Sequence, residues 1–518
     1  MDRSATRAWT AGDLDGVLGG WTALPGPLYR RLADALGEAV RTGDLAPGDR
    51  LPAERPLAAA LAVSRATVAD AYDALRGAGL AVSRRGSGTR VAALPRAALR
   101  PADGRVRGGT GAALVQRLVD GPVEVISLSV AAEGAAPEVR QALAGLLADG
   151  LEPLLAQPGY HPCGLPELRA AVADRYTGQG LPTTPEQVLV TTGATQALGL
   201  VAQLYVRRGS PVVVESPAWP GCLDALLAAG ARLRRVPLDG DGVRLPAFAQ
   251  ALPGAALAHV TPTYHNPTGV LMSEGRRTRI AELCAREGVP LVEDLAYDTR
   301  IRDTPEPGPV ARYAPAGAEV LSVGSLAKAA WGGLRIGWVR GPAAAVERLA
   351  RLKALADLGS PLLDQALAAR LLPGVDALRA RRAETLRARL ALLESLLRAE
   401  LPDWRWRRPD GGGALWLELP DGADASVFAR VALRHGVELV PGSATDPSGA
   451  HDAYVRLPFT LPDARLEVLA ARLGRSWTAY RGTARPRPDR RAPRVPPRAT
   501  PPERAEGLPR STGGTCHN

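Results

Sequence analysis

The stretch Ser325-Leu-Ala-Lys328-Ala-Ala-Trp-Gly-Gly-Leu-Arg335 contains one of only two lysines in a chain of 518 residues. The other 62 of the 64 basic residues are arginine, so this chain nearly always uses arginine for a solvated positive charge. An amine that must lose its proton and attack a carbonyl has to be lysine, because guanidinium is not deprotonated in proteins. Lys328 follows a strand-like run among apolar and glycine neighbours, and Ser325 and Arg335 flank it at spacings that suit a phosphate. It is therefore a candidate cofactor-binding lysine, whereas Lys353, in a charged helical run, is expected at the surface.

Other groups that such a site needs follow strand-like runs upstream. The turn Thr192-Gly-Ala194-Thr195 leads from a strand into a helix, so its backbone N–H groups could bind a phosphate. Trp219 offers a flat ring that could stack on a planar cofactor, although a large aromatic residue is more often part of a core.

Three polar side chains match the atoms of a pyridine ring. Asp294 and Tyr297 end one strand-like run, one helical turn apart, and Asn266 lies on a turn after another. A carboxylate can pair with a protonated pyridine nitrogen, so that the ring can act as an electron sink. Asn266 and Tyr297 could hydrogen-bond a phenolic oxygen on the same ring.

The long middle part of the chain alternates strand-like and helical runs. The strand-like runs are residues 188–191, 212–215, 233–236, 257–261, 291–293, 320–323 and 336–339. Seven strands with helices between them predict a doubly wound α/β domain with a mostly parallel sheet. A long helical run over 349–400 and the segment after it predict a smaller α+β lobe.

The N-terminal part predicts three helices and a basic hairpin. Apolar residues recur at helical spacing after Pro27, and a second short helix is expected within 51–61. Ser64 is a good N-cap for a third helix, whose first turn exposes Arg65 and Thr67. A recognition helix presents side chains to base edges in the major groove in this way.

The hairpin carries arginines at a glycine-rich tip, Arg85-Gly86-Ser87-Gly88, which suits contacts to phosphates or the minor groove. Three helices followed by this basic wing predict binding to double-stranded DNA. The net charge of +11 is weak support by itself, because the general bias towards arginine inflates it.

Length and composition predict two or three folded units. The expected segments are an N-terminal extension (1–25), a DNA-binding unit (26–92), a linker (93–125), the α/β domain with its small lobe (126–477) and a disordered Arg/Pro-rich tail (478–518). The tail is either a solvated segment that results only from the compositional bias of the chain, or an auxiliary contact to nucleic acid.

Cysteine spacing and the distribution of apolar residues indicate the cellular compartment and whether a metal is bound. Four cysteines lack metal-ligand or disulfide spacing, so no metal site is predicted and a reduced cytoplasm is expected. The sequence shows no signal segment and no apolar run of bilayer length, which argues against secretion or a membrane location.

Residues 27 to 92 resemble the winged helix-turn-helix of GntR-type regulators. The resemblance is carried by Leu51-Pro-Ala-Glu-Arg55, by Val63-Ser-Arg-Ala-Thr-Val68 and by Arg85-Gly-Ser-Gly-Thr89. It implies that Arg55, Arg65, Thr67 and the Gly86 to Gly88 wing contact DNA.

Residues 126 to 477 resemble the fold-type I pyridoxal phosphate domain of class I aminotransferases. The matching motifs are Tyr160-His-Pro-Cys-Gly164, His265-Asn-Pro-Thr-Gly269, Asp294-x-x-Tyr297, Ser325-x-x-Lys328 with Arg335, Gly411-Gly-Gly-Ala-Leu-Trp416 and Val455-Arg456-Leu-Pro-Phe459. The resemblance implies that Lys328 bonds to the cofactor aldehyde, and that Asp294 pairs with the pyridine nitrogen. Asn266 and Tyr297 would bind the phenolate, and Trp219 would stack on the ring. The implied phosphate ligands are Ala194, Thr195, Ser325 and Arg335, with Tyr160 reaching the partner subunit's phosphate and Arg456 clamping a substrate carboxylate.

The order of the two domains is similar to that of the MocR subfamily of GntR regulators, whose members are typically head-to-tail dimers. This implies a pyridoxal-phosphate-dependent transcription regulator that senses an amino-acid-like amine. Two alternatives stay open. The chain could be an active aminotransferase with an accessory DNA-binding domain, or it could sense pyridoxal phosphate itself. The substrate-side loop 130–137 lacks the usual Pro-Gly and Phe-Pro landmarks of the family.

Overall fold

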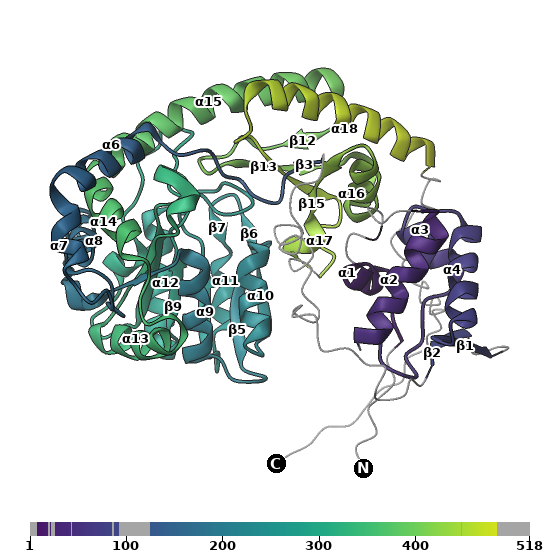
Figure 1. Ribbon diagram of the computed structural model, residues 1–518, viewed down its shortest axis with the longest axis horizontal. Coiled ribbons are helices and arrows are strands. Elements are labelled where there is room, and N and C mark those ends of the chain that lie inside the picture. Colours follow the sequence, from purple (N-terminus) through teal and green to yellow (C-terminus); the bar gives the residue numbers. More distant parts are fainter. Residues whose placement is uncertain are drawn as a thin grey trace, which may run out of the picture.

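The chain forms three parts that Figure 1 shows side by side. They are the N-terminal unit (8–92), a large lobe (mainly 137–371) and a small lobe (mainly 401–483). The computed structural model describes residues 8–18, 21, 26–42, 44–84, 88–92, 125–446 and 448–483. The expected linker, apart from residue 125, and the tail from residue 484 onward lie outside the described residues.

The N-terminal unit consists of a helix cluster and a hairpin. Its elements are α1 (Ala11–Leu18), α2 (Leu28–Thr42), α3 (Glu54–Ala60), α4 (Arg65–Gly77), β1 (Ala81–Arg84) and β2 (Gly88–Val91). The expected N-cap forms, because the side chain of Ser64 accepts the N–H of Thr67 at 3.0 Å. The sequence pattern had not indicated α1, whose Leu14 and Leu18 are buried in the same core as α2 and α4.

The large lobe is built on an eight-stranded sheet with the order β4-β11-β10-β9-β8-β5-β6-β7. The strands are β4 (Val188–Thr191), β5 (Pro211–Ser216), β6 (Arg232–Asp239), β7 (Gly242–Val243), β8 (Leu257–Val260), β9 (Leu291–Asp294), β10 (Val320–Ser325) and β11 (Gly337–Arg340). All seven predicted strands are present, and β11 runs antiparallel to both of its neighbours. The prediction missed the eighth strand, β7, because a two-residue strand is too short to produce an alternating pattern.

Helices cover both faces of this sheet, as a doubly wound fold requires. On one face the apolar core is shared with α9 (Ala194–Tyr205), α10 (Pro220–Ala228) and α13 (Ala343–Asp357). On the other face it is shared with α8 (Pro166–Gly178), α11 (Leu245–Ala251), α12 (Glu274–Glu287) and α14 (Leu362–Leu371). The parallel strands end at one edge of the sheet, so the residues that follow them are brought together there.

The single helical run expected over 349–400 is divided into α13, α14 and α15 (Val375–Glu400). Leu358, with φ +54°, and Gly359, with φ +150°, end α13, and Pro361 precedes α14. A helix cannot continue through such backbone. In Figure 1, α15 arches over the top from the large lobe to the small lobe.

The small lobe has a four-stranded sheet, and α15 also packs into its apolar core. Its strands are β12 (Arg405–Trp406), β13 (Ala414–Glu418), β16 (Tyr454–Pro458) and β15 (Val440–Pro441), with a separate pair of β14 (Val437–Glu438) and β3 (Ile126–Ser127). It also contains α16 (Ala425–Arg434), α17 (Gly442–Thr445) and α18 (Asp463–Thr483). The α18 helix continues past the boundary expected at residue 477, because Tyr480 is buried against Trp477 and Phe428.

The remaining elements are short. They are α6 (Pro137–Gly145), η3 (Leu146–Gly150), α7 (Leu151–Leu155), η4 (Pro185–Gln187), η5 (Val310–Tyr313), η6 (Ala327–Trp331), η7 (Gly332–Leu334), η8 (Leu372–Gly374) and η9 (Pro420–Gly422). None of the helices described has the length and apolar content needed to cross a lipid bilayer.

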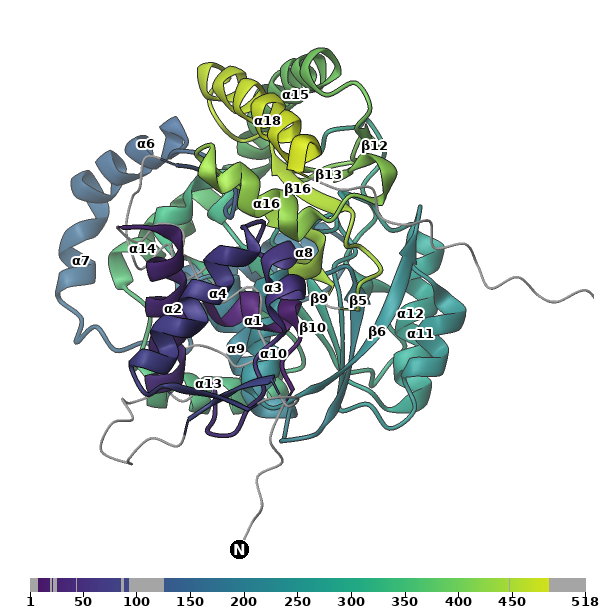
Figure 2. The same ribbon diagram turned by 90° about the vertical axis from the view of Figure 1, so that its right-hand side faces the viewer.

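The N-terminal unit lies against the small lobe at α16, and Figure 2 shows α3 directly beside that helix. The guanidinium of Arg430, on α16, donates a hydrogen bond to the carbonyl of Ala60 at the end of α3. Ala62 packs against the apolar core of the small lobe. Ala60 is the last residue of α3, and Ala62 lies in the turn that leads from α3 into α4.

Candidate functional site

Lys328 lies at the edge where the parallel strands end. It belongs to η6, three residues beyond the end of β10. Its Nζ donates to the carbonyl of Ala131 and stands 5.1 Å from the centroid of the Tyr297 ring. The structure thus brings together Lys328 and Tyr297, which the sequence had assigned to one site.

Tyr297 also receives a hydrogen bond from Arg456, which comes from the small lobe. Arg456 Nη2 donates to the Tyr297 hydroxyl at 3.0 Å, and Arg456 itself is buried. Burial alone would raise the pKa of Tyr297, but the positive charges of Lys328 and Arg456 hold it below its ordinary value. A phenol with a lowered pKa is a good hydrogen-bond donor to an anionic oxygen.

Asp294 ends β9 and is buried among other titratable groups. Its Oδ1 accepts the N–H of Ala296 at 2.9 Å. Burial raises the pKa of Asp294, while the neighbouring imidazole of His259 acts in the opposite direction. Within the described residues, neither ring nitrogen of His259 has a hydrogen-bond partner. A buried carboxylate in this position needs a positive partner, which a protonated pyridine nitrogen would provide.

The turn before α9 forms a cradle for a phosphate. Gly193 has φ +89°, and a Cβ on this residue would lie 2.7 Å from Arg335 Nη2. The same Nη2 donates to the carbonyl of Thr192 at 2.8 Å. The N–H groups at the start of a helix have no helical acceptors and favour an anion. The donors present fit the phosphate end of the cofactor that the sequence motifs imply.

The other expected site residues differ in exposure. Asn266 is buried, Trp219 is half-buried at the start of α10, and Thr195 is exposed at the start of α9. The hydroxyl of Ser325 is buried and donates to the carbonyl of Ile336 at 3.2 Å. Tyr160 is 71% exposed.

Lys353 is not a surface residue, which corrects the expectation from the sequence. Its side chain is fully buried, and its Nζ lies 2.9 Å from Asp357 Oδ1. Asp357 Oδ2 accepts Gln196 Nε2, and Gln196 Oε1 accepts the N–H of Thr192, each at 2.9 Å. Sequence reasoning missed Lys353 and Gln196. The one available signal was that lysine is kept here in a chain that otherwise uses arginine.

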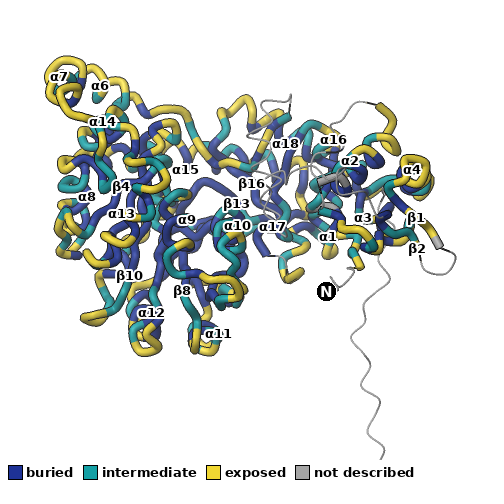
Figure 3. Tube along the Cα trace, turned by 60° about the horizontal axis from the view of Figure 1, so that its bottom comes forward, coloured by how far each residue is buried: buried dark blue, intermediate teal, exposed yellow. Residues whose placement is uncertain are grey.

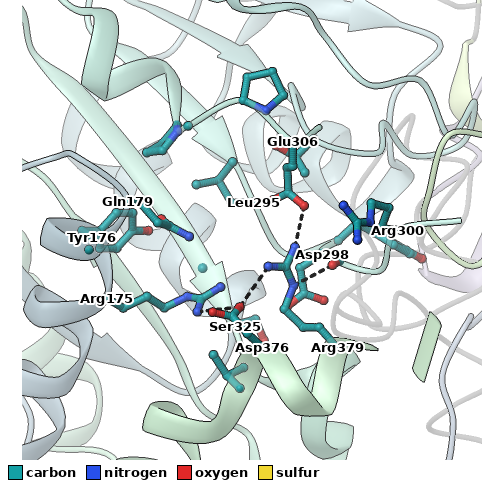
Figure 4. Close-up of a pocket in the computed structure, with 18 of the residues that line it drawn as sticks. Arg175, Tyr176, Gln179, Leu295, Asp298, Arg300, Glu306, Ser325, Asp376 and Arg379 are labelled. Atoms are coloured by element: carbon teal, nitrogen blue, oxygen red, sulfur yellow. Dashed lines mark hydrogen bonds and ion pairs between the residues drawn. The ribbon is translucent and has the colours of Figure 1, made fainter. Parts of the chain in front are cut away.

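A cavity of about 710 Å³ lies beside the cofactor cradle, on the face of the sheet that carries α8. Figure 4 shows Arg379 at its centre, where it pairs with Glu306 at 2.7 Å, with Asp376 at 3.2 Å and with Asp298 at 3.6 Å. Ser325 and Tyr297 belong to its wall, but Lys328, Asn266 and Arg456 do not. The charged groups of this cavity therefore largely neutralise one another.

The residues expected to read DNA lie at the start of α4 and near it. Arg55 is exposed, and the side chain of Arg65 is 66% exposed and pairs with Glu54 at 2.8 Å. Gly88 has φ +78°, which a hairpin tip requires and glycine adopts without strain. Arg85, Gly86 and Ser87 lie outside the described residues.

Two protein families match this chain in different segments. Residues 28–91 match bacterial regulatory proteins of the GntR family, and residues 138–473 match aminotransferases of class I and II. Fold and motifs thus define a helix-turn-helix regulator joined to a fold-type I aminotransferase domain. The chain belongs to the MocR-type regulators of the GntR family.

Individual relatives agree with this assignment. The chain is 31% identical to the uncharacterised HTH-type transcriptional regulator YisV of Bacillus subtilis, over 84% of this chain and 92% of that protein. It is 32% identical to the probable rhizopine catabolism regulatory protein MocR of Rhizobium meliloti, over 80% of this chain and 86% of that protein. Among solved structures, LysN, the α-aminoadipate aminotransferase of Thermus thermophilus in complex with N-(5'-phosphopyridoxyl)-L-leucine, superposes with a TM-score of 0.63. It is 30% identical and covers 73% of this chain and 98% of that one.

Proposed function

We propose that this regulator binds its operator with an affinity set by a primary amine that carries a carboxylate and reaches the Lys328 site. One observation carries the proposal. The turn before α4 rests on α16 of the small lobe, the same lobe that supplies Arg456 to the site. A ligand that moves the small lobe would therefore also move the support of the DNA-reading helix.

Pyridoxal phosphate is the cofactor that fits the residues of the site. When bound, it supplies an aldehyde that captures primary amines and a ring that withdraws electrons. Lys328 would hold the aldehyde end, Asp294 the pyridine nitrogen, and Asn266 and Tyr297 the phenolic oxygen. Trp219 would cover one face of the ring, and the phosphate would be bound by Ala194, Thr195, Ser325 and Arg335.

Arg456 is the residue best suited to select a carboxylate. Its guanidinium is buried, and its Nε has no hydrogen-bond partner among the described residues. A buried guanidinium with an unused donor is strongly stabilised by an anionic acceptor. An amine without a carboxylate would lack this interaction.

We also propose a head-to-tail homodimer in the cytoplasm, the compartment of its DNA partner. Large apolar side chains are exposed at the ends of α13 and α14 and around α6 and α7, which Figure 3 colours mainly as exposed. They are Leu143, Leu147, Leu155, Tyr160, Leu355, Leu358 and Leu363. Clustered exposed apolar groups favour association. Tyr160 would then reach the partner subunit's phosphate.

The effect on operator affinity should be graded. Coupling between two sites is typically about 1–3 kcal/mol, which changes affinity roughly 5- to 150-fold. The Arg65 and Thr67 side chains at the start of α4, with Arg55 and the Arg85 to Gly88 wing, would contact DNA, and Ser64 would cap the recognition helix.

The second candidate is an active aminotransferase. The observation that favours it is the complete set of Lys328, Asp294, Tyr297 and Arg456, because Lys328 could move a proton as well as hold the cofactor. Sensing of pyridoxal phosphate alone is a third reading, which needs no amine effector.

The test combines DNA retention with absorbance. The wild-type protein should retain a fragment upstream of its own gene, with an affinity that an amino acid changes only when pyridoxal phosphate is bound. Lys328→Ala should abolish the cofactor absorption band and this response while leaving basal DNA binding intact. Steady transamination at ordinary enzyme rates, with no fragment retained, would establish the enzyme reading instead.

A further inference from the structure

A chain of hydrogen bonds leads from Lys353 to the turn before α9. The Lys353 ammonium lies 2.9 Å from one carboxylate oxygen of Asp357, and Gln196 Nε2 donates to the other at 2.9 Å. Gln196 Oε1 then accepts the N–H of Thr192, again at 2.9 Å. Thr192 is followed directly by Gly193 and by the start of α9. Three side chains thus join the interior of α13 to the candidate phosphate cradle.

Two side chains fix the turn before α9, because one binds the N–H of Thr192 and the other binds its carbonyl. Gln196 accepts its N–H, and Arg335 donates to its carbonyl at 2.8 Å. The N–H groups that a phosphate would use are those of Ala194 and Thr195, which have no acceptor within the helix. Their direction depends on the backbone immediately before them, which Gln196 and Arg335 hold.

The charge of Lys353 keeps this chain of contacts in one protonation state. Burial alone would raise the pKa of Asp357, but hydrogen bonds from Gln196 and Lys353, together with the Lys353 charge, hold it below its ordinary value. An ionised Asp357 can only accept hydrogen bonds, so it forces Gln196 to present its amide N–H₂ to Asp357 and its oxygen to Thr192.

Lysine rather than arginine fits this place for a physical reason. The side chain is fully buried within the apolar core beside α9, and Asp357 is its only charged partner among the described residues. A guanidinium would bring five donors into this space, whereas an ammonium is compact. In a chain with 64 basic residues, lysine is kept at only two positions. One is Lys328, and the other, Lys353, is linked to the turn before α9 through Asp357 and Gln196.

Asp357 also supports a second piece of the site. It accepts the N–H of Gly359 at 3.1 Å. A Cβ on Gly359 would lie 3.0 Å from the carbonyl oxygen of His161, so this turn packs closely on the loop that carries Tyr160. The same carboxylate therefore stabilises both segments that are expected to approach a phosphate.

We propose that Lys353 is a positioning residue for the phosphate end of the cofactor. Its ammonium holds Asp357, Asp357 orients Gln196, and Gln196 sets the direction of the N–H groups at the start of α9. This role rests on the proposed function, because the phosphate in question is that of pyridoxal phosphate.

The test is a titration of full-length protein with pyridoxal phosphate and with pyridoxal, which has the same ring and aldehyde but no phosphate. Lys353→Met keeps the length of the side chain and removes its charge. The dissociation constant for pyridoxal phosphate should rise on the order of 10-fold, as expected for loss of a charge-assisted hydrogen bond. The constant for pyridoxal should stay within about twofold of wild type. Equal changes for both ligands, or no change for either, would overturn the proposal.

A double-mutant cycle separates positioning from general stability. Gln196→Leu should weaken binding of pyridoxal phosphate by a similar factor, and the double variant Lys353→Met/Gln196→Leu should be no weaker than Gln196→Leu alone. Additive losses would show that Lys353 does not act through Gln196. The ³¹P resonance of the bound cofactor should shift in both single variants.

The remaining outcomes are also decisive. If Lys353→Met does not fold, Gln196→Leu alone tests the path, and unchanged preference for pyridoxal phosphate over pyridoxal would overturn it. If the wild-type protein fails to bind pyridoxal phosphate, the proposed function and this role fall together. If the wild type binds pyridoxal phosphate and the variants bind it with the same affinity as the wild type, the proposed role of Lys353 is wrong, but the proposed function is unaffected.

Discussion

The N-terminal unit and the cofactor site place their functional residues in opposite environments. Arg55 and Arg65 are exposed, so their removal should leave the helix cluster beneath them intact. Asp294, Arg456 and Lys353 are buried, and each is bound into a network of polar contacts. Function and stability are therefore separable at the DNA-reading surface but coupled at the cofactor site.

The largest effect is expected at Arg456, which is buried and which we propose binds the carboxylate of the effector. Arg456→Gln should weaken binding of amino acids by about 2–5 kcal/mol, because a desolvated carboxylate loses its charged partner. The measurement is the amino-acid-induced change in the cofactor absorption spectrum. Amines that lack the carboxylate should bind both proteins with similar affinity. A similar loss for both kinds of amine would show that Arg456 supports the fold of the site and does not select the carboxylate.

At the exposed surface, Arg65→Ala should weaken operator binding by about 1–3 kcal/mol, the usual contribution of a good base contact. Its free energy of unfolding should change by less than about 0.5 kcal/mol, because the ion pair with Glu54 is exposed. Fragment retention and urea denaturation measure the two quantities. Arg76→Ala, at the other end of α4, is the matched control and should leave operator binding nearly unchanged. Unfolding of the Arg65 variant would contradict the separation of function from stability.

Asp294→Asn should stabilise the cofactor-free protein. Burial raises the pKa of Asp294 above its ordinary value of 3.8, so the folded state binds the proton more tightly than the unfolded state. The free energy of unfolding therefore falls as the pH rises from the pKa of Asp294 in the unfolded state to its pKa in the folded state. This loss of stability remains at neutral pH. The variant should gain about 1–2 kcal/mol at pH 7, with little gain near pH 4.

Urea denaturation without cofactor at the two pH values measures this difference. In the presence of pyridoxal phosphate the order should reverse, because the asparagine cannot pair with a protonated pyridine nitrogen. A wild-type protein that is more stable than the variant in both conditions would show that His259 already neutralises the carboxylate.

The smallest effect is expected for the cap of α4. Ser64→Ala should destabilise the N-terminal unit by about 1 kcal/mol, because the N–H of Thr67 loses its acceptor. Ser64→Asp should restore most of this loss. Thermal unfolding followed by circular dichroism measures both variants, and equal destabilisation by both would argue against a capping role.

Much of the site could be predicted because it depends on residue type. Only lysine can do what Lys328 is expected to do, and Asp294, Asn266 and Tyr297 each stand at the end of a strand-like run. The parallel strands then bring these ends to one edge of the sheet. The cap at Ser64 is likewise local, and it was confirmed.

Other features could not be predicted, because they depend on contacts between distant segments. Gln196 and Asp357 are 161 residues apart, and Arg456 and Tyr297 are 159 residues apart. The contact of Arg430 with Ala60 spans 370 residues. No periodicity or motif in the sequence indicates such pairs. Lys353 was expected at the surface because it lies in a charged helical run, but it is on the buried face of α13.

The sequence by itself determined the two kinds of domain and their order, and it predicts the chemistry of Lys328, because these follow from residue types, their spacing and local backbone preferences. Only the tertiary structure decided that Lys353 is buried, that Arg456 meets Tyr297 and that the turn before α4 rests on the small lobe. These features arise from how separate elements pack, and packing sets which polar groups lose water and must find partners in the protein.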